Sequence, residues 1–256
     1  MLICIDAGHY LGTPGKRCLK RIDPQETREW VLNARAADKV QEILAGYDCE
    51  TMRVDDVTGQ EEVTLYERVS AANRAGADLY LSIHHNAGIN GGSGGGIVVY
   101  ACPGADQQSK AVQQAIYQHT VAETRLRGNR ANPMPEGNLY VLNASAMPAV
   151  LGEFGFMDST TDTPQILTEA FADQLARGIV EALVEVYGLK EVDAVTYEQW
   201  KEFMKRYQQE QGQLPPSDWA QEGLAQAKAR GITDATRPQS EATRQEVALM
   251  INAAIK

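Results

Sequence analysis

The sequence predicts an α/β fold: a mixed, largely parallel twisted sheet of about six strands flanked by helices, followed by a small all-helical module. Up to about Gly188, short apolar runs alternate with longer helical stretches, which is typical of strands connected by helices. From Thr196 onward the patterns are helical only. A chain of 256 residues is long enough for one sizeable core and a small appendage. We therefore expect a first domain at residues 1–188, a linker at 189–195 and a helical module at 196–256.

The elements of the first domain follow from hydrophobic periodicity. A short apolar run bounded by turn residues predicts a buried strand, and apolar residues repeating every three to four positions predict a helix. Strands are expected at Leu2–Ile5, Cys49–Val54, Leu79–Ile83, Ile97–Ala101, Leu139–Val141 and Ala149–Glu153. Helices are expected at Pro24–Leu44, Thr64–Arg74, Gln107–Arg125 and Pro164–Tyr187.

The expected start of the first helix distinguishes Glu26 from Glu29 as candidate metal ligands. Asp23 can cap this helix, Pro24 suits its first position, and Glu26 stands where a capping-box carboxylate reaches back. The cap gives Glu26 a structural explanation that Glu29 lacks. Glu29 is therefore the better candidate for a metal ligand.

The stretch Gly88–Gly96 carries six glycines and cannot hold a regular element, so we expect a mobile loop beside His84. It lacks the Gly-Lys-Ser/Thr ending of a phosphate-binding loop, which excludes a nucleotide site there.

In the C-terminal module, Thr243 and Glu246 have capping-box spacing before the last helix. About sixty residues make a marginal module, so we expect it to pack on itself, on the first domain or on a second copy. Its helices are expected at Tyr197–Glu210, Asp218–Ala229 and Arg244–Ile255.

The net charge and the spacing of the cysteines argue against several classes of function. The net charge of -10 gives no excess of positive charge that would bind nucleic acid. It also argues against adhesion to an anionic membrane. The N-terminus shows no signal peptide, and no apolar run is long enough to cross a bilayer. The four cysteines lack CxxC spacing, which favours free thiols in a reducing compartment. We expect synthesis in the cytosol.

Two histidines and two glutamates carry the functional prediction. His9, His84 and Glu153 each follow or end an apolar run, at the strand ends where α/β proteins place their chemistry, and Glu29 lies near the start of the first helix. Two imidazoles and one carboxylate are the ligand set of a catalytic zinc that keeps a position open for water. A further carboxylate in an apolar strand could be the general base. The set is typical of a zinc hydrolase.

Each of these residues also has a purely structural interpretation. His9 could be a loop histidine bonded to backbone, and Glu29 a solvated residue of a helix face. Glu153 could be satisfied by backbone donors. Burying its ionised form in an apolar strand is costly, however, and desolvation would raise its pKa toward the range of a general base.

His84 and His85 are adjacent on a predicted strand, so their side chains point to opposite faces of the sheet. His84 shares its face with Ser82 and Asn86, whereas His85 shares a face with aliphatic residues. We therefore favour His84 as a ligand and interpret His85 as a satisfied, partly buried histidine. His119 lies mid-helix among polar residues and is expected to be exposed.

The order of the motifs resembles the zinc-dependent N-acetylmuramoyl-L-alanine amidases (amidase_3 type), over residues 1 to about 188. The motifs are Asp6-Ala7-Gly8-His9, Glu29-x-x-x-Asn33, Asn73 before Ser82-Ile83-His84-His85-Asn86-Ala87, Leu139–Leu142 and Met147–Phe156. Ala7 where proline is common and His85 within the Ser-Ile-His motif depart from the family pattern, and neither removes a ligand.

The resemblance implies Zn²⁺ held by His9, Glu29 and His84, with Glu153 as the catalytic carboxylate. The substrate would be bacterial peptidoglycan, cut at the amide between N-acetylmuramic acid and the L-alanine of the stem peptide. Asn33 and Asn86 are candidates for substrate binding or for support of the ligands, although packing explains them equally well.

The C-terminal module resembles an S-layer-homology unit, a kind of module that binds secondary polymers of Gram-positive cell walls. The resemblance rests on Trp219-Ala220, Ala229-Arg230-Gly231-Ile232, Pro238 and Thr243-Arg244-Gln245-Glu246. Such units usually occur in several copies, and one is visible here. A helical appendage that packs or dimerises is the alternative to wall attachment.

A catalytic domain with a wall-binding module and no signal peptide resembles a bacteriophage endolysin. Such bacteriolytic enzymes accumulate in the cytosol and reach the wall through a membrane lesion, and a host autolysin would share this pattern. Two other functions remain open: a zinc peptidase acting within the stem peptide, and a non-catalytic wall-binding protein. The presence of all four site residues disfavours the second.

Overall fold

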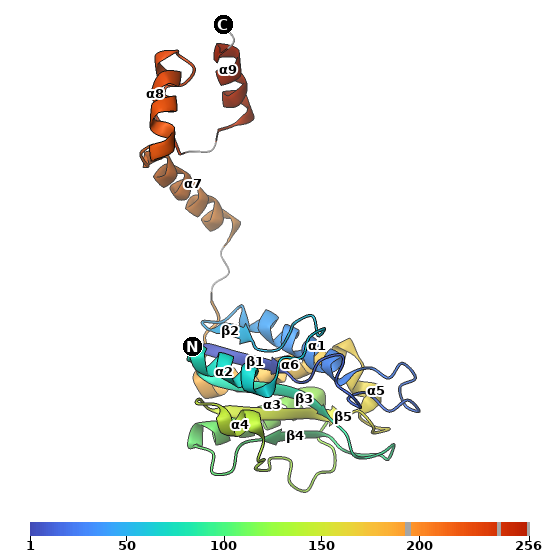
Figure 1. Cartoon of the computed structure of the whole chain (residues 1–256). Coiled ribbons are helices and arrows are strands. Elements are labelled where there is room, and N and C mark those ends of the chain that lie inside the picture. Colours follow the sequence, from blue (N-terminus) through green and yellow to red (C-terminus); the bar gives the residue numbers. More distant parts are fainter. Residues whose placement is uncertain (193–195, 240–241, 255–256) are drawn as a thin grey trace. The chain divides into compact units, whose positions relative to one another are not determined.

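The computed structural model describes residues 1–192, 196–239 and 242–254. The chain divides into two compact units, Met1–Val192 and Asp193–Lys256 (Figure 1). In the first unit, the strands are β1 (Leu2–Ala7), β2 (Glu50–Arg53), β3 (Leu79–Asn86), β4 (Ile97–Tyr100) and β5 (Ala149–Phe156). The helices are α1 (Glu29–Leu44), α2 (Leu65–Ala75), α3 (Gln107–Thr124), α4 (Tyr140–Ala144), α5 (Thr163–Ile166) and α6 (Glu169–Tyr187).

The strands form one sheet in the order β2-β1-β3-β5-β4, parallel except for β4, which runs antiparallel to β5. This confirms the predicted mixed α/β fold with helices on the sheet. The register pairs Ala7 with Ile83 and His84 with Glu153. The carboxyl ends of β1, β3 and β5 therefore meet at the same edge of the sheet.

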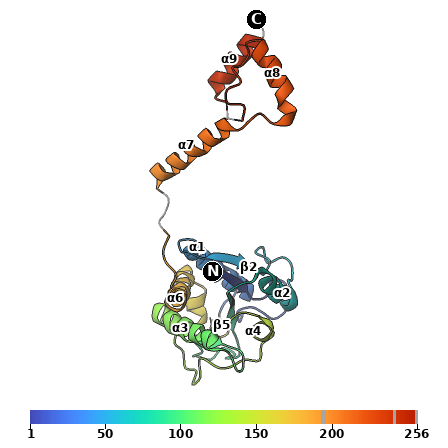
Figure 2. The same ribbon diagram turned by 90° about the vertical axis from the view of Figure 1, so that its left-hand side faces the viewer.

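Helices cover both faces of this sheet (Figure 2). Side chains alternate along a strand, so Ile3 and Ile5 join a core with α1, α3 and α6, while Cys4 joins a second core with α2 and α4. The two cores make three layers, α/β/α, with the sheet in the middle.

The expected strand at Leu139–Val141 is wrong, because this segment leads into helix α4. Val141 and Leu142 are both buried, and Asn73 of α2 holds the end of α4 through hydrogen bonds to Ala144 O (3.0 Å) and from Ala146 N (2.9 Å). A short apolar run cannot distinguish a strand from a buried helix by periodicity, and here packing on α2 decides.

The first helix begins later than expected, at Glu29, and the predicted capping box does not form. The Asp23 carboxylate instead accepts hydrogen bonds from the backbone N–H groups two and four residues on, which closes a turn. Glu26 has a φ of 52° and pairs with Arg17 (3.1 Å) and Lys20 (3.5 Å). Glu26 thus has a surface role, for a different reason from the one the sequence suggested.

The helix expected at Pro164–Tyr187 is two helices, α5 and α6. The break lies at Thr168, whose hydroxyl caps α6 by accepting from Phe171 N (3.1 Å). Helices α2 and α3 lie within one residue of their predicted bounds.

The glycine-rich loop 88–96 has no helix or strand, as expected, but it is tied down by residues 158–162. Asp158 Oδ2 accepts from Gly88 N (2.9 Å) and Asn90 N (2.5 Å), and Asp162 Oδ2 accepts from Gly96 N (2.7 Å). The prediction of a mobile loop did not include these partners, because they lie some seventy residues away in the sequence.

Strand β4 forms one edge of the sheet, and its outward backbone groups are occupied. Val99 N donates to Pro133 O (2.9 Å), and Ala101 N donates to Pro135 O (3.4 Å). Val99 O accepts from the side chain of Gln113 (2.8 Å).

Residues 189–192, expected in the linker, lie against residues 46–48. Asp48 N donates to Lys190 O (2.9 Å), and Val192 N donates to Gly46 O (2.8 Å).

The second unit contains α7 (Tyr197–Gln213), the 3₁₀ helix η1 (Asp218–Ala220), α8 (Gln221–Ala229) and α9 (Arg244–Ala254). The expected capping box before α9 is confirmed: Glu246 N donates to Thr243 Oγ1 (3.2 Å), and Thr243 N donates to Glu246 Oε2 (2.7 Å). Across the described part of the chain, none of the helices combines the length and apolar character that crossing a bilayer requires.

His119 links α3 to α6 and yields a pH-dependent prediction. Its imidazole is 28% exposed, and its Nδ1 and Nε2 lie 3.2 Å from Glu181 and 2.6 Å from Glu185. Burial acts to lower its pKa, but the two carboxylates outweigh burial and raise this pKa above 6.5. The stabilisation is therefore complete below about pH 6.5 and is lost as the pH rises through the folded-state pKa.

His119→Gln should lower the free energy of unfolding by about 0.5 kcal/mol near pH 5.5, and by less near pH 9, because exposed pairs are partly screened. Urea unfolding at both pH values measures this difference. An equal loss at the two pH values would contradict the ion-pair interpretation.

Candidate functional site

Three polar side chains meet at the carboxyl edge of the sheet: His9 after β1, Glu29 at the start of α1 and His84 in β3. Glu29 Oε1 lies 3.0 Å from His84 Nδ1 and 3.3 Å from His9 Nε2. The two imidazole rings are edge to face, with centroids 4.9 Å apart. One ligand atom from each residue lies within 4.8 Å of the other two, so the three could hold a metal ion together.

The backbone at His9 positions its imidazole. His9 has a φ of 68°, in the left-handed region that non-glycine residues seldom adopt. Its carbonyl oxygen accepts from Arg68 Nη2 (2.7 Å), and Gly8 N donates to Ile83 O (3.0 Å), which fixes the end of β1 on β3.

Gly8 makes room for the second histidine. A Cβ built on Gly8 would lie 2.0–2.5 Å from three atoms of the His84 ring, closer than any real contact. A residue without a side chain is therefore required for His84 to reach its place beside His9.

Arg68 of α2 is a site residue that the sequence analysis missed. It is buried, and its guanidinium donates to Asp6 Oδ1 (2.5 Å), to Ala7 O (2.8 Å) and to His9 O. Asp6 also accepts from Ser82 Oγ (2.8 Å). Asp6 could have indicated such a residue from the sequence, because a carboxylate inside an apolar strand needs a buried hydrogen-bond donor.

Glu29 is buried and ionised. Burial acts to raise the pKa of Glu29, but hydrogen bonds and charges from His84 and His9 outweigh burial and hold this pKa far below its usual value. Its Oε1 also accepts from the backbone N–H of His85 (3.3 Å), and Lys16 Nζ lies 3.6 Å from Oε2. The carboxylate is thus in the form that a metal ligand needs.

His85 and Asn33 lie behind the site. His85 is buried, and burial lowers its pKa to about 3, so its imidazole is neutral. Its Nδ1 lies 2.8 Å from Asn33 Oδ1, while Asn33 Nδ2 donates to Gly8 O (3.0 Å). Asn33 is fully buried with its amide engaged on both sides. Asn33 thus links α1 to Gly8 and to His85.

Asn86, the other candidate for substrate binding, is half-buried at the end of β3. Its Oδ1 accepts from Ala87 N (2.8 Å), and its backbone oxygen accepts from Met157 N (2.7 Å). The side-chain amide nitrogen of Asn86 remains compatible with a substrate contact.

Glu153 lies on β5 beside His84. The pKa of Glu153 is raised to about 7: burial is the largest cause, the charges of His84 and Lys16 oppose it, and the charge of Glu29 adds to it. Within the described residues its buried Oε2 has no hydrogen-bond partner. An unpaired carboxyl that titrates near neutral pH can accept and return a proton.

The donor set fits a zinc ion. Two imidazole nitrogens and one carboxylate oxygen are ligands that zinc accepts, and three protein ligands leave a further position open. In the described part of the chain, buried His9 Nε2 and Glu29 Oε2 also lack hydrogen-bond partners. A bound metal would satisfy such atoms.

Comparisons with known proteins show the family to which this chain is related. The Amidase_3 family model, described as N-acetylmuramoyl-L-alanine amidase, matches residues 3–185. The sporulation-specific N-acetylmuramoyl-L-alanine amidase of Bacillus subtilis (strain 168) is 34% identical over 195 residues, which cover 75% of this chain and 70% of the relative. The endolysin of Bacillus phage SPP1 is 31% identical over 195 residues, covering 74% and 67%.

Solved structures share the fold of the first unit. The N-acetylmuramoyl-L-alanine amidase from Clostridium difficile 630 superposes with a TM-score of 0.65 at 29% identity, over 73% of this chain and 96% of that one. The catalytic domain of CwlV from Bacillus (Paenibacillus) polymyxa var. colistinus gives 0.64 at 26% identity, over 74% and 99%. From the family match over residues 3–185 and these relatives, the chain belongs to the N-acetylmuramoyl-L-alanine amidase family.

Proposed function

We propose that this protein is a zinc-dependent N-acetylmuramoyl-L-alanine amidase. It hydrolyses the amide between the lactyl group of N-acetylmuramic acid and the L-alanine of the stem peptide in peptidoglycan. The observation that carries the proposal is the meeting of His9, Glu29 and His84 beside Glu153, in a chain of this family.

His9, Glu29 and His84 would hold the zinc. When bound, zinc supplies a Lewis acid that polarises the scissile carbonyl and lowers the pKa of water. Arg68 and Gly8 hold His9 and His84 in place, so the ligands are organised before the metal arrives.

Glu153 moves the proton in this mechanism. Its pKa of about 7 leaves a large ionised fraction at neutral pH, so Oε2 can take the proton of the attacking water. The protonated carboxyl then delivers that proton to the alanine nitrogen as the amide bond breaks. One residue thus acts first as base and then as acid.

We further propose that residues 196–256 attach the enzyme to a secondary wall polymer, and that the protein acts as an endolysin released through a membrane lesion. Support comes from the sequence resemblance of this module to an S-layer-homology unit and from the similarity to the SPP1 endolysin. Co-sedimentation of the intact chain with purified walls tests the attachment. Equal binding after chemical removal of the secondary polymer would contradict it.

Glu153→Gln should lower the turnover of peptidoglycan by about 10²–10⁴-fold, because the amide can neither accept nor return the proton. The measurement is mass spectrometry of soluble products from a wall digest by the zinc-loaded protein. The parent should release stem peptides that begin with free L-alanine. Glu50→Gln, at an exposed position of β2, is the control and should keep parental activity.

Products cut inside the stem peptide would replace the amidase assignment with a peptidase. No release by the parent from walls of several cross-link types would contradict the enzymatic proposal.

Zinc should stabilise the first unit through its three ligands. Free zinc at about 100 times its dissociation constant adds about 2.7 kcal/mol, which raises Tm by roughly 5–10 °C for a unit of this size. Glu29→Gln should abolish most of this shift in a thermal scan. Glu42→Gln, at an exposed position on the same helix, should keep it. A full shift in the Glu29 variant would exclude Glu29 as a ligand.

Gly8→Ala should weaken zinc binding at least about tenfold, because the added methyl group displaces the His84 ring. Competition against a chromophoric chelator measures the affinity. Gly46→Ala is the matched control, since the nearest atom to its added Cβ lies 3.4 Å away. Equal affinities in the two variants would show that the close approach at Gly8 is unimportant for the site.

A further inference from the structure

Helix α7 of the second unit carries a repeating pattern of large side chains. Counting from Tyr197, positions three and four residues apart alternate along the whole helix and just past its end. The positions are Tyr197, Trp200, Met204, Tyr207, Gln211 and Leu214. This average spacing of 3.5 residues is typical of the seam of a coiled coil, in which one helix packs along another. We call these six residues the α7 seam.

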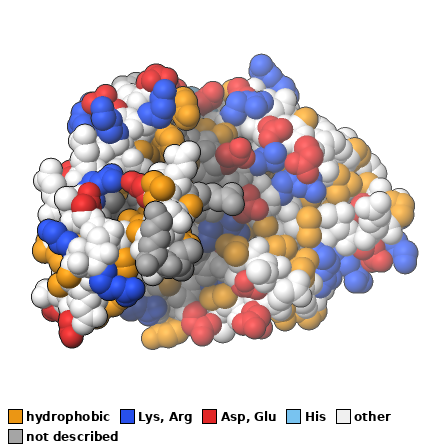
Figure 3. Space-filling model, turned by 90° about the horizontal axis from the view of Figure 1, so that it is seen from above, with side chains coloured by type: hydrophobic (Ala, Val, Ile, Leu, Met, Phe, Trp, Pro, Cys, Tyr) orange, Lys and Arg blue, Asp and Glu red, His pale blue; other side chains and the backbone are white. Residues whose placement is uncertain are grey.

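Four of the six residues of the α7 seam are exposed, and Met204 and Gln211 are half-buried. Tyr197 is 69% exposed, Trp200 50% and Tyr207 55%, and Phe203 beside them is 53% exposed. Helices α7, η1 and α8 contain no buried residue in the described structure. Apolar side chains reach the molecular surface among charged ones in Figure 3. An aromatic row of this size on a marginal unit indicates a missing partner.

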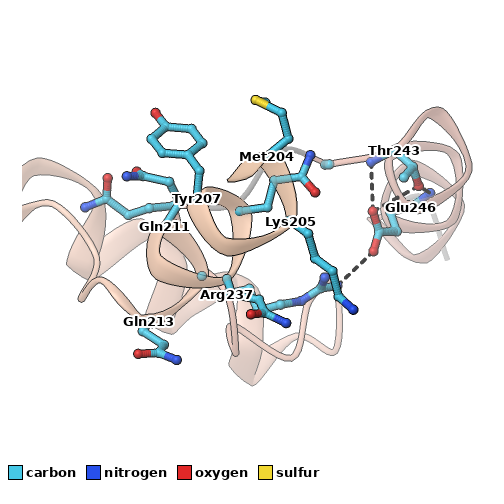
Figure 4. A pocket seen from close by; sticks show the side chains of 13 residues that line it. Met204, Lys205, Tyr207, Gln211, Gln213, Arg237, Thr243 and Glu246 are labelled. Carbon is cyan, nitrogen blue, oxygen red and sulfur yellow. Dashed lines mark hydrogen bonds and ion pairs between the residues drawn. The ribbon is translucent and has the colours of Figure 1, made fainter. Parts of the chain in front are cut away.

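Within residues 196–239 and 242–254, the second unit does not supply that partner itself. Between α7 and a wall that contains Arg237, Gln239, Ala242, Thr243 and Glu246 lies a hollow of about 1030 Å³ (Figure 4). From α7 it is lined by Met204, Tyr207 and Gln211 and by five residues outside the seam, Lys205, Gln208, Gln209, Gly212 and Gln213. On its other side Arg237 pairs with Glu246 at 2.9 Å. The hollow therefore lies largely against the polar side of α7, and among the described residues its other wall offers the three seam residues little apolar surface.

We propose that the α7 seam pairs with the α7 seam of a second copy of this chain, making the protein a homodimer. A helix with one continuous seam is self-complementary about a two-fold axis, so the same surface serves both copies. Among the positions that flank the seam, Lys201 and Glu210 carry opposite charges, so pairing brings no row of like charges together.

The area available suits a dimer. Four half-exposed aromatic side chains offer roughly 400 Å² per copy, since each such side chain can bury about 150–250 Å² in full. Met204, Leu214 and the stems of the flanking side chains bring this to roughly 600 Å² per copy, or roughly 1,200 Å² in total. This reaches the lower bound of specific interfaces, so the dimer should dissociate at low concentration.

The test is the mass of the intact chain in solution, by sedimentation equilibrium over about a hundredfold range of concentration. The parent should approach twice 28.0 kDa at the upper end. Trp200→Glu should remain at 28.0 kDa throughout, because it places a charge in the seam. Gln209→Glu adds the same charge on the opposite face of α7 and should dimerise like the parent.

Trp200→Ala provides a second variant that keeps the helix and adds no charge; it should weaken dimerisation at least tenfold. Circular dichroism verifies that both Trp200 variants retain parental helix content. A parent that stays at 28.0 kDa at every concentration overturns the proposal and leaves the first unit or a wall component as the partner of the seam. Dimerisation unchanged in both Trp200 variants overturns it as well.

Discussion

The burial of one ionised carboxylate, Glu29, sets the requirements that the rest of the first unit meets. A charge removed from water costs several kcal/mol unless donors surround it. His84 Nδ1 and the backbone N–H of His85 contact the carboxylate from β3, and His9 Nε2 lies 3.3 Å away after the end of β1. Helix α1 must therefore begin beside that edge of the sheet. The register of β1 on β3 must also place His9 and His84 next to each other.

The groups that hold this arrangement lie away from the reacting atoms. Arg68 joins α2 to the end of β1 through Asp6 and the backbone of His9, so a helix on one face of the sheet fixes a ligand at its edge. Asn33 makes the corresponding link from α1 through the Gly8 carbonyl. The geometry of the site is thus distributed over both layers of helices. Its precision comes from packing as much as from the ligands.

Much of this could be predicted from the sequence, because periodicity and strand ends are local properties. The sheet and three of the site residues, His9, His84 and Glu153, follow from apolar runs that end in polar residues. Glu29 follows from its place near the start of the first predicted helix. The exceptions share a physical cause: their partners are distant in sequence. Leu139–Val141 becomes helical through α2, the glycine-rich loop is held by residues 158–162, and Arg68 resembles an ordinary charged residue of a helix face until Asp6 lies beside it. The turn at Asp23 is different, since the same residues suit a helix cap or a turn.

The edge strand β4 has a consequence for the protein at high concentration. The N–H groups of Val99 in β4 and of Ala101 just after it donate to the carbonyl oxygens of Pro133 and Pro135. Proline has no N–H, so this neighbouring segment accepts hydrogen bonds without offering the alternating donors that another strand would need. Strand addition, the usual route from an open sheet edge to amyloid-like aggregates, is therefore blocked on this side. Two prolines thus protect this edge of the sheet from pairing with the strand of another copy.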